Sequence, residues 1–270
     1  MKVLTEAFAR VRRPPFHSSL VRPLHRAALN PRPKVLQVQS AFQGSLQSSL
    51  QSFTSPFWSG NATSMSTSTM PTLSPSATQD INRTLSFWFD GPTQNWFAPP
   101  NPSEFDASIR DTFGELITQA RTDELDTWAD DPRGALALVI LLDQFPRNIY
   151  RGSGEAHASD AKACELATRS IAREFDRQVG ELEAMFFYLP LMHDETLVSQ
   201  IACVALYEAL LARCQPDGEA AKLVPRSLNF AKGHRDAILE FGRFPSRNKI
   251  LGRESTPEEI KFLEEHPSGF

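Results

Sequence analysis

The distribution of acidic residues divides this 270-residue chain into two unlike parts. Residues 1–79 contain eight Lys and Arg but a single acidic residue, Glu6, and so carry a net charge of +7. Residues 80–270 contain 20 basic and 31 acidic residues, a net charge of −11. The first part is also rich in Ser and Thr between Ser45 and Thr78 and has no sustained hydrophobic period, so it cannot bury enough apolar surface to fold. We therefore expect a disordered leader over 1–79 and a single folded domain over 80–270.

The leader has the composition of a mitochondrial transit peptide, which is rich in Arg and Ser and poor in acidic residues. Leu4, Phe8 and Val11 can share one side of a short basic helix, and no apolar run typical of a secretory signal is present. We expect delivery to the mitochondrial matrix. The alternatives are a disordered tail or a misassigned gene start, and initiation at Met65 or Met70 would give a cytoplasmic form without the leader.

Composition and charge exclude several classes of protein. The longest apolar run, residues 135–142, is far shorter than the roughly 20 residues of a membrane span, and 41% hydrophobic residues is typical of a soluble globular protein. A domain of net charge −11 without a basic stripe argues against nucleic-acid binding. Cys164, Cys203 and Cys214 have no C-x-x-C spacing, so we expect small buried side chains in a reducing compartment and no structural zinc.

From Asp80 onward, apolar residues recur at intervals of three or four, and no segment alternates as a strand would. The pattern predicts an all-α domain. The expected helices cover residues 80–90, 103–117, 132–146, 159–175, 181–188, 195–213, 219–241 and 256–263. The loops between them are short, which favours antiparallel neighbours and hence stacked helical hairpins.

Local signals predict several helix ends. Ser103 and Asp106 resemble a capping box, and Thr256, followed by Pro and by Glu three residues on, begins the last helix. Pro146 should end the apolar central helix, and Pro190 should close the short helix over 181–188, because proline has no N–H to continue the hydrogen bonding. Gly242 follows the long helix over 219–241 at the position where a left-handed residue commonly ends a helix.

One short motif occurs twice, over residues 144–152 and 243–253. Each copy follows a long helix and contains Phe-Pro, then an Arg-Asn pair, then an apolar residue and Gly. A structural interpretation is sufficient for either copy alone, because Arg and Asn side chains can donate to the carbonyls that proline leaves without a partner. The Arg-Asn pairs would then be braces at helix ends.

A functional interpretation starts from the density of charged groups near the two copies. Arginines clustered within an acidic domain would form an anion site, since guanidinium groups bind carboxylate or phosphate in a bidentate manner. The residues expected to bind a ligand are Arg147, Asn148, Arg151, Arg235, Arg243, Arg247 and Asn248. The residues expected to act in catalysis are His193 and His234 as acid and base, with Asp143 and Asp236 orienting them.

We predict no metal and no cofactor. A metal site built from the two histidines with Asp143, Glu195 or Asp236 is chemically feasible, but no H-x-x-x-H or E-x-x-H spacing supports it. The chain also has no G-x-S-x-G motif, P-loop or dinucleotide-binding fingerprint.

Three stretches of the sequence, residues 141–152, 188–193 and 234–248, resemble the domain of unknown function 924 family, and the resemblance extends over about residues 81–270. It implies an all-α fold of antiparallel helical hairpins in a tetratricopeptide-like, right-handed superhelical arrangement, and no established biochemical role. Family members usually carry His where this chain has Ser246, and Phe where it has His157. Ser246 weakens any mechanism that needs a histidine in the second motif, and His157 should occupy a packing position.

Two functions remain open. In the first, the chain is an enzyme or a binding protein for a small, anionic molecule, with an Arg- and His-lined pocket. In the second, it is a helical module that binds a protein partner, and the Arg-Asn pairs only brace its hairpins.

Overall fold

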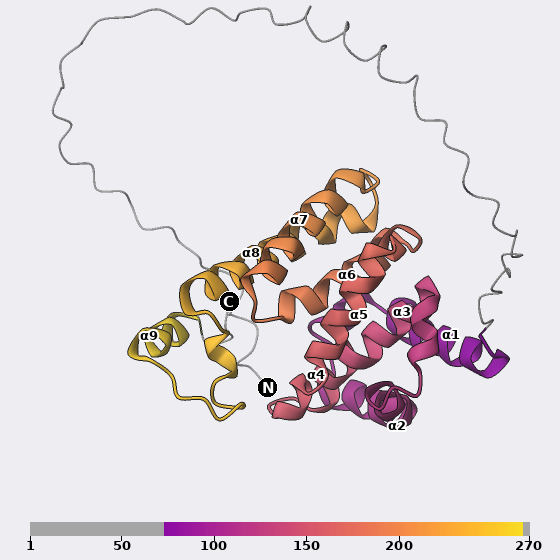
Figure 1. Ribbon diagram of the computed structural model, residues 1–270, viewed down its shortest axis with the longest axis horizontal. Coiled ribbons are helices and arrows are strands. Elements are labelled where there is room, and N and C mark those ends of the chain that lie inside the picture. Colours follow the sequence, from indigo (N-terminus) through magenta and orange to yellow (C-terminus); the bar gives the residue numbers. More distant parts are fainter. Residues whose placement is uncertain (1–72, 267–270) are drawn as a thin grey trace, which may run out of the picture. The chain divides into compact units, whose positions relative to one another are not determined.

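The computed structural model describes residues 73–266, all of which belong to one compact unit. Every regular element within 73–266 is helical, which confirms the all-α prediction (Figure 1). Residues 1–72 of the expected leader, with the alternative starts at Met65 and Met70, lie outside the described residues. The first helix begins at Pro75, so helical structure starts before the boundary predicted at Asp80. Among the helices over 73–266, none combines the length and apolar character required to cross a bilayer.

Nine α-helices and several short turns of 3₁₀- or π-helix make up the described part of the chain. The α-helices are α1 (Pro75–Phe89), α2 (Pro102–Arg121), α3 (Pro132–Val139), α4 (Phe145–Ile149), α5 (Asp160–Ala172), α6 (Glu181–His193), α7 (Leu197–Arg213), α8 (Glu219–Phe241) and α9 (Pro257–Glu265). The short turns are η1 (Thr93–Trp96), η2 (Asp126–Asp130), η3 (Ile140–Gln144), η4 (Gly154–His157), η5 (Phe175–Arg177) and η6 (Pro245–Arg247), of which η3 is a π-helix.

Residues 135–142 are fully buried at the centre of the fold, as their continuous apolar character predicts. Helices α1, α2, α5 and α6 pack around them. Four large aromatic side chains with less than 2% exposure, Trp88, Phe113, Phe145 and Phe186, form edge-to-face or tilted pairs on one side of this central segment.

The helix ends predicted at Thr256 and Gly242 are confirmed, whereas those at Ser103, Pro146 and Pro190 are wrong. The Thr256 hydroxyl accepts from the Glu259 backbone N–H, and the Glu259 carboxylate accepts in return from the Thr256 N–H. Gly242 ends α8 with φ +68°. The expected capping box of Ser103 and Asp106 does not form, because α2 begins earlier, at Pro102, and Asp106 binds Arg151 instead.

Pro146 does not end the central helix, contrary to expectation, because α3, η3 and α4 continue to Ile149. The missing N–H is compensated from elsewhere in the chain: the Ser159 hydroxyl donates to the Leu142 carbonyl, four residues before the proline, at 2.8 Å. The π-helical turn also adds one residue to the central helix at Asp143, a distortion frequent at functional sites.

Pro190 likewise lies inside α6, where the sequence predicted an end, and the helix continues to His193. The last residue of α6 therefore reaches the region where the central helix carries its π-helical turn.

The spacing of Leu197, Ile201, Val204 and Leu211 predicts that they form the buried face of α7, but the structure buries a different face. Val204 is buried as expected, but Ile201 is 55% exposed, and Leu197 and Leu211 are also exposed. Buried polar side chains take the inner positions because they bond the neighbouring helix: Gln200 donates to carbonyls at the end of α6, and the Tyr207 hydroxyl donates to the Met185 carbonyl. Helices α7 and α8 run side by side as a hairpin (Figure 1).

Candidate functional site

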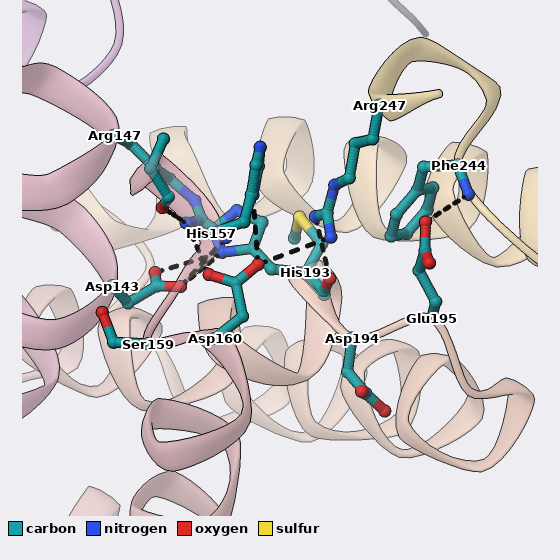
Figure 2. Close-up of polar contacts among 12 residues, drawn as sticks. Asp143, Arg147, His157, Ser159, Asp160, His193, Asp194, Glu195, Phe244 and Arg247 are labelled. Carbon is teal, nitrogen blue, oxygen red and sulfur yellow. Dashed lines mark hydrogen bonds and ion pairs between the residues drawn. The ribbon is translucent and has the colours of Figure 1, made fainter. Parts of the chain in front are cut away.

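Charged side chains from distant parts of the chain meet around Asp160, at the N-terminus of α5 (Figure 2). Arg147 donates from Nη1 to Asp160 Oδ1 at 2.8 Å, and its Nη2 lies 3.3 Å from Asp143 Oδ1. Arg247, from η6, lies 3.4 Å from Asp160 Oδ2 and donates to the His193 carbonyl at 2.8 Å. The equivalent arginines of the two motif copies thus converge on one carboxylate.

Asp143 and His193 form a buried pair within this cluster. His193 Nδ1 lies 2.8 Å from Asp143 Oδ1 and 3.1 Å from Oδ2, and the Asp143 side chain is fully buried. An ionised carboxylate only accepts hydrogen bonds, so Nδ1 of a neutral His193 carries the proton and Nε2 is left with its lone pair. The pairing fixes both the tautomer and the orientation of the ring.

The charges around this pair favour an ionised aspartate and a neutral histidine. Burial alone would raise the pKa of Asp143, but Arg147 and His193 outweigh it and hold that pKa below its ordinary value. Burial, followed by the charge of Arg147, lowers the pKa of His193, and the opposing effect of Asp143 is smaller. At neutral pH His193 is therefore uncharged and able to accept a proton at Nε2.

Two further histidines lie beside the cluster. The ring of His234, from α8, has its centroid 6.5 Å from that of His193, and its Nδ1 donates to the Phe230 carbonyl at 2.8 Å. Burial lowers the pKa of His234 to about 3. His157, where family members usually carry Phe, is 17% exposed and also belongs to the site, because its Nδ1 lies 3.2 Å from Asp160 Oδ2.

A pocket of about 430 Å³ opens onto these groups. Its lining consists of Arg147, His157, His193, Phe230, His234, Phe244, Ser246, Arg247 and Ile250. A smaller pocket of about 210 Å³ shares Arg147 and His193 with it and is lined also by Asn148 and Arg151. The predicted residues Asp143, Arg147, His193, His234 and Arg247 are thus gathered at one hollow, with Asn148 and Arg151 next to it.

Each motif copy combines an arginine that points into the site with an Asn-Arg brace outside it. Asn148 Oδ1 accepts from Arg151, and Asn248 Oδ1 accepts from Arg253. The outer arginines then bind carboxylates, Arg151 that of Asp106 and Arg253 that of Glu195. The structural and the functional interpretations of the motif therefore each describe part of it.

Four predicted site residues lie away from the pocket. Arg235 binds its neighbour Asp236 on the surface of α8, at 2.7 Å. Arg243 and Asn248 both bond Glu259, the capping residue of α9, and the bonds from Arg243 contribute most to lowering the Glu259 pKa to about 2. The structure thus gives Arg243 and Asn248 a role in holding α9.

Asp160 and His157 were not among the predicted site residues, although Asp160 is the carboxylate that both inner arginines share. The one feature of the sequence that could have indicated them is their spacing of three residues, which places the His157 and Asp160 side chains on the same side of a helix start. Within residues 73–266, no group of three His, Cys, Asp or Glu side chains is arranged to hold a metal ion.

The fold and the site together define an all-α protein that holds a buried Asp–His pair between two arginines. A family model described as "Bacterial protein of unknown function (DUF924)" matches residues 84–267, and the chain belongs to this family. The chain is also similar to a solved structure of a protein of unknown function, ATU0120 from Agrobacterium tumefaciens. The two are 36% identical with a TM-score of 0.61, over 70% of this chain and 99% of that one. No curated protein matches the chain.

Proposed function

We propose that this protein binds a small anionic molecule in the pocket of about 430 Å³ and that His193 acts there as a general base. One observation carries the proposal: a neutral imidazole, held by the buried Asp143, lies on the pocket wall together with Arg147 and Arg247. This is the combination that proton transfer beside a bound anion requires.

The arginines have capacity for a ligand beyond their internal contacts. The Nη2 atom of Arg147 is buried and makes no hydrogen bond to any residue within 73–266, although Asp143 lies 3.3 Å away. The contact between Arg247 and Asp160, at 3.4 Å, is long for a charged hydrogen bond. A carboxylate or phosphate group in the pocket would bond the accessible edges of both guanidinium groups, since both arginines line it.

Each group then has a distinct role in the proposed chemistry. Arg147 and Arg247 bind the anionic group and stabilise negative charge that develops in the transition state. His193 takes a proton at Nε2 from the ligand or from a water molecule beside it, and Asp143 stabilises the resulting imidazolium. His234, whose ring is 6.5 Å from that of His193, is the second candidate for proton transfer.

Titration of the full chain with inorganic phosphate and with acetate, followed by the NMR shifts of the histidine rings, tests the proposal. We expect the His193 signals to move on binding, and Arg247→Gln to weaken binding at least about tenfold, because it removes a charge-assisted contact. Arg235→Gln is the matched control, since Arg235 bonds only its surface neighbour Asp236 among the described residues. Equal binding by the wild type and Arg247→Gln, with the fold intact by circular dichroism, would refute the proposal.

A helical interaction module in a tetratricopeptide-like arrangement is the second candidate. It is supported by exposed apolar side chains at the start of α7, where Val198 is 79% and Ile201 55% exposed. A Val198→Asp, Ile201→Asp double variant would then lower the molar mass measured by light scattering, if the partner is a second copy. An unchanged mass, with anion binding retained, would favour the first candidate.

We also propose that residues 1–79 direct the protein to the mitochondrial matrix. The proposal is supported by their composition, eight basic residues with a single acidic one. Synthesis from Met65 or Met70 would leave the alternative form in the cytoplasm.

A further inference from the structure

A second hollow lies beside the Arg- and His-lined pocket. It measures about 310 Å³ and shares three lining residues with that pocket, namely His193, Phe230 and His234. The two hollows therefore adjoin at these three side chains, and a molecule held by Arg147 and Arg247 lies next to the second one.

The second hollow differs in chemistry from the first. Its wall is formed mainly by Phe97, Leu189, Met192, Leu223 and Phe230. The charged group that lines it is Arg226, whose guanidinium lies 5.7 Å from the centroid of the Phe230 ring. Apart from Arg226, Ser227 and the shared histidines, the lining of the second hollow is apolar, whereas Arg147 and Arg247 line the first.

The aromatic side chains of this wall are unusually accessible for their size. Phe97 is 57% and Phe230 44% exposed, although both have apolar neighbours in the same hollow. Concave apolar surface left open to water is a common feature of ligand sites, because filling it releases the hydrophobic free energy that the fold alone did not gain.

We infer that the ligand is amphipathic: an anionic carboxylate or phosphate group bound by Arg147 and Arg247, with an aliphatic or aromatic tail that fills the hollow walled by Phe97, Leu189, Met192, Leu223 and Phe230. This inference rests on the proposed function and adds the substrate class. The space is too small for a helix or an extended protein segment, so a small molecule is the occupant that fits it.

A chain-length series measures the tail contribution directly. Acetate, butyrate, hexanoate and octanoate are titrated into the full chain by calorimetry, and the corresponding alkyl phosphates form a second series that separates the two head groups. We expect the affinity to rise about fourfold per methylene that enters the hollow, the ratio that corresponds to about 0.8 kcal/mol per buried methylene. One of the two head groups should bind more tightly than the other at every chain length.

Substitutions of Leu223 test whether the rise in affinity with chain length arises in this hollow. Leu223→Asp should abolish the dependence on length and weaken octanoate binding far more than acetate binding, because Leu223 lines only the apolar hollow among the pockets described. Val198→Asp places the same charge on an exposed position of α7 and is the matched control. Leu223→Ala, which should reduce the dependence, serves if the Asp variant fails to fold.

The outcomes separate this inference from the proposed function. Binding of the short anions with an affinity that does not change with length would overturn the amphipathic ligand and leave the anion site standing. A length dependence that persists in Leu223→Asp and Leu223→Ala would also overturn it. Absence of binding by every anion in both series would overturn the inference and the proposed function together.

Discussion

Arg147 lines the pocket and also pairs with the buried Asp143, so its replacement by Ala should change stability by an amount that can be worked out from the structure. The substitution removes the cation from Asp143, whose side chain is fully buried, and the 2.8 Å bond to Asp160. Removing one member of a buried ion pair leaves an uncompensated charge and costs about 3–5 kcal/mol. We expect Arg147→Ala to lower the free energy of unfolding by that amount.

Urea denaturation followed by tryptophan fluorescence is a suitable assay, because Trp88, Trp96 and Trp128 are buried in the folded domain. Arg151→Ala is the matched control from the same motif copy. Its side chain is 49% exposed and its ion pair with Asp106 is partly screened by water, so the expected loss is only about 0.2–1 kcal/mol.

A double variant tests the cause of the destabilisation by Arg147→Ala as well as its size. Asp143→Asn removes the buried negative charge, so the additional cost of Arg147→Ala in that background should fall by about 1–3 kcal/mol. If Arg147→Ala costs no more than Arg151→Ala, or the same in both backgrounds, then Asp143 does not depend on this arginine for its charge. The same experiment shows why loss of ligand binding by Arg147→Ala is informative only beside a measurement of folding.

Three further predictions follow from single features. The free energy of unfolding should fall by about 1–2 kcal/mol from pH 7 to pH 5, because His234, with a pKa of about 3, stays neutral in the folded protein, whereas in the unfolded chain this histidine takes up a proton below its ordinary pKa of 6.5. The lowered pKa of His193 acts in the same direction. A His234→Gln variant whose urea midpoints show the same fall would contradict the assignment to His234. Gly134→Ala should destabilise the protein by about 1–3 kcal/mol, because the new Cβ would lie 2.3 Å from the Trp128 carbonyl oxygen. Gly114→Ala should instead stabilise α2 by about 0.5–1 kcal/mol, because its Cβ would have no atom within 4 Å beyond the adjoining backbone of its own helix, and equal melting temperatures of the two variants would refute this. A chain that starts at Met65 should lose import into isolated mitochondria without a change in its circular dichroism, and retained import would exclude the transit peptide.

Much of the fold could be predicted because its determinants are local. The cap at Thr256, the left-handed Gly242 and the buried run over residues 135–142 each depend on neighbours a few residues away, and each is confirmed. The helix ends predicted at Pro146 and Pro190 are wrong for the opposite reason. Whether a helix survives a proline depends on a donor from another segment, which at Pro146 is Ser159.

The site was predicted in part. The side chains of Asp143, Arg147, His193 and Arg247 do meet, as the density of charged residues near the repeated motif predicted. Asp160 was missed because its importance comes from two arginines, 13 and 87 residues along the chain, that no local pattern connects to it.

The amino-acid sequence by itself determined the helical class, the central position of residues 135–142 and the residue types able to bind an anion and move a proton. Only the tertiary structure decided which arginine of each motif copy points into the pocket and which one braces a neighbouring helix. The physical reason is that the two roles use the same guanidinium chemistry, and the partner that folding brings within about 3 Å decides between them.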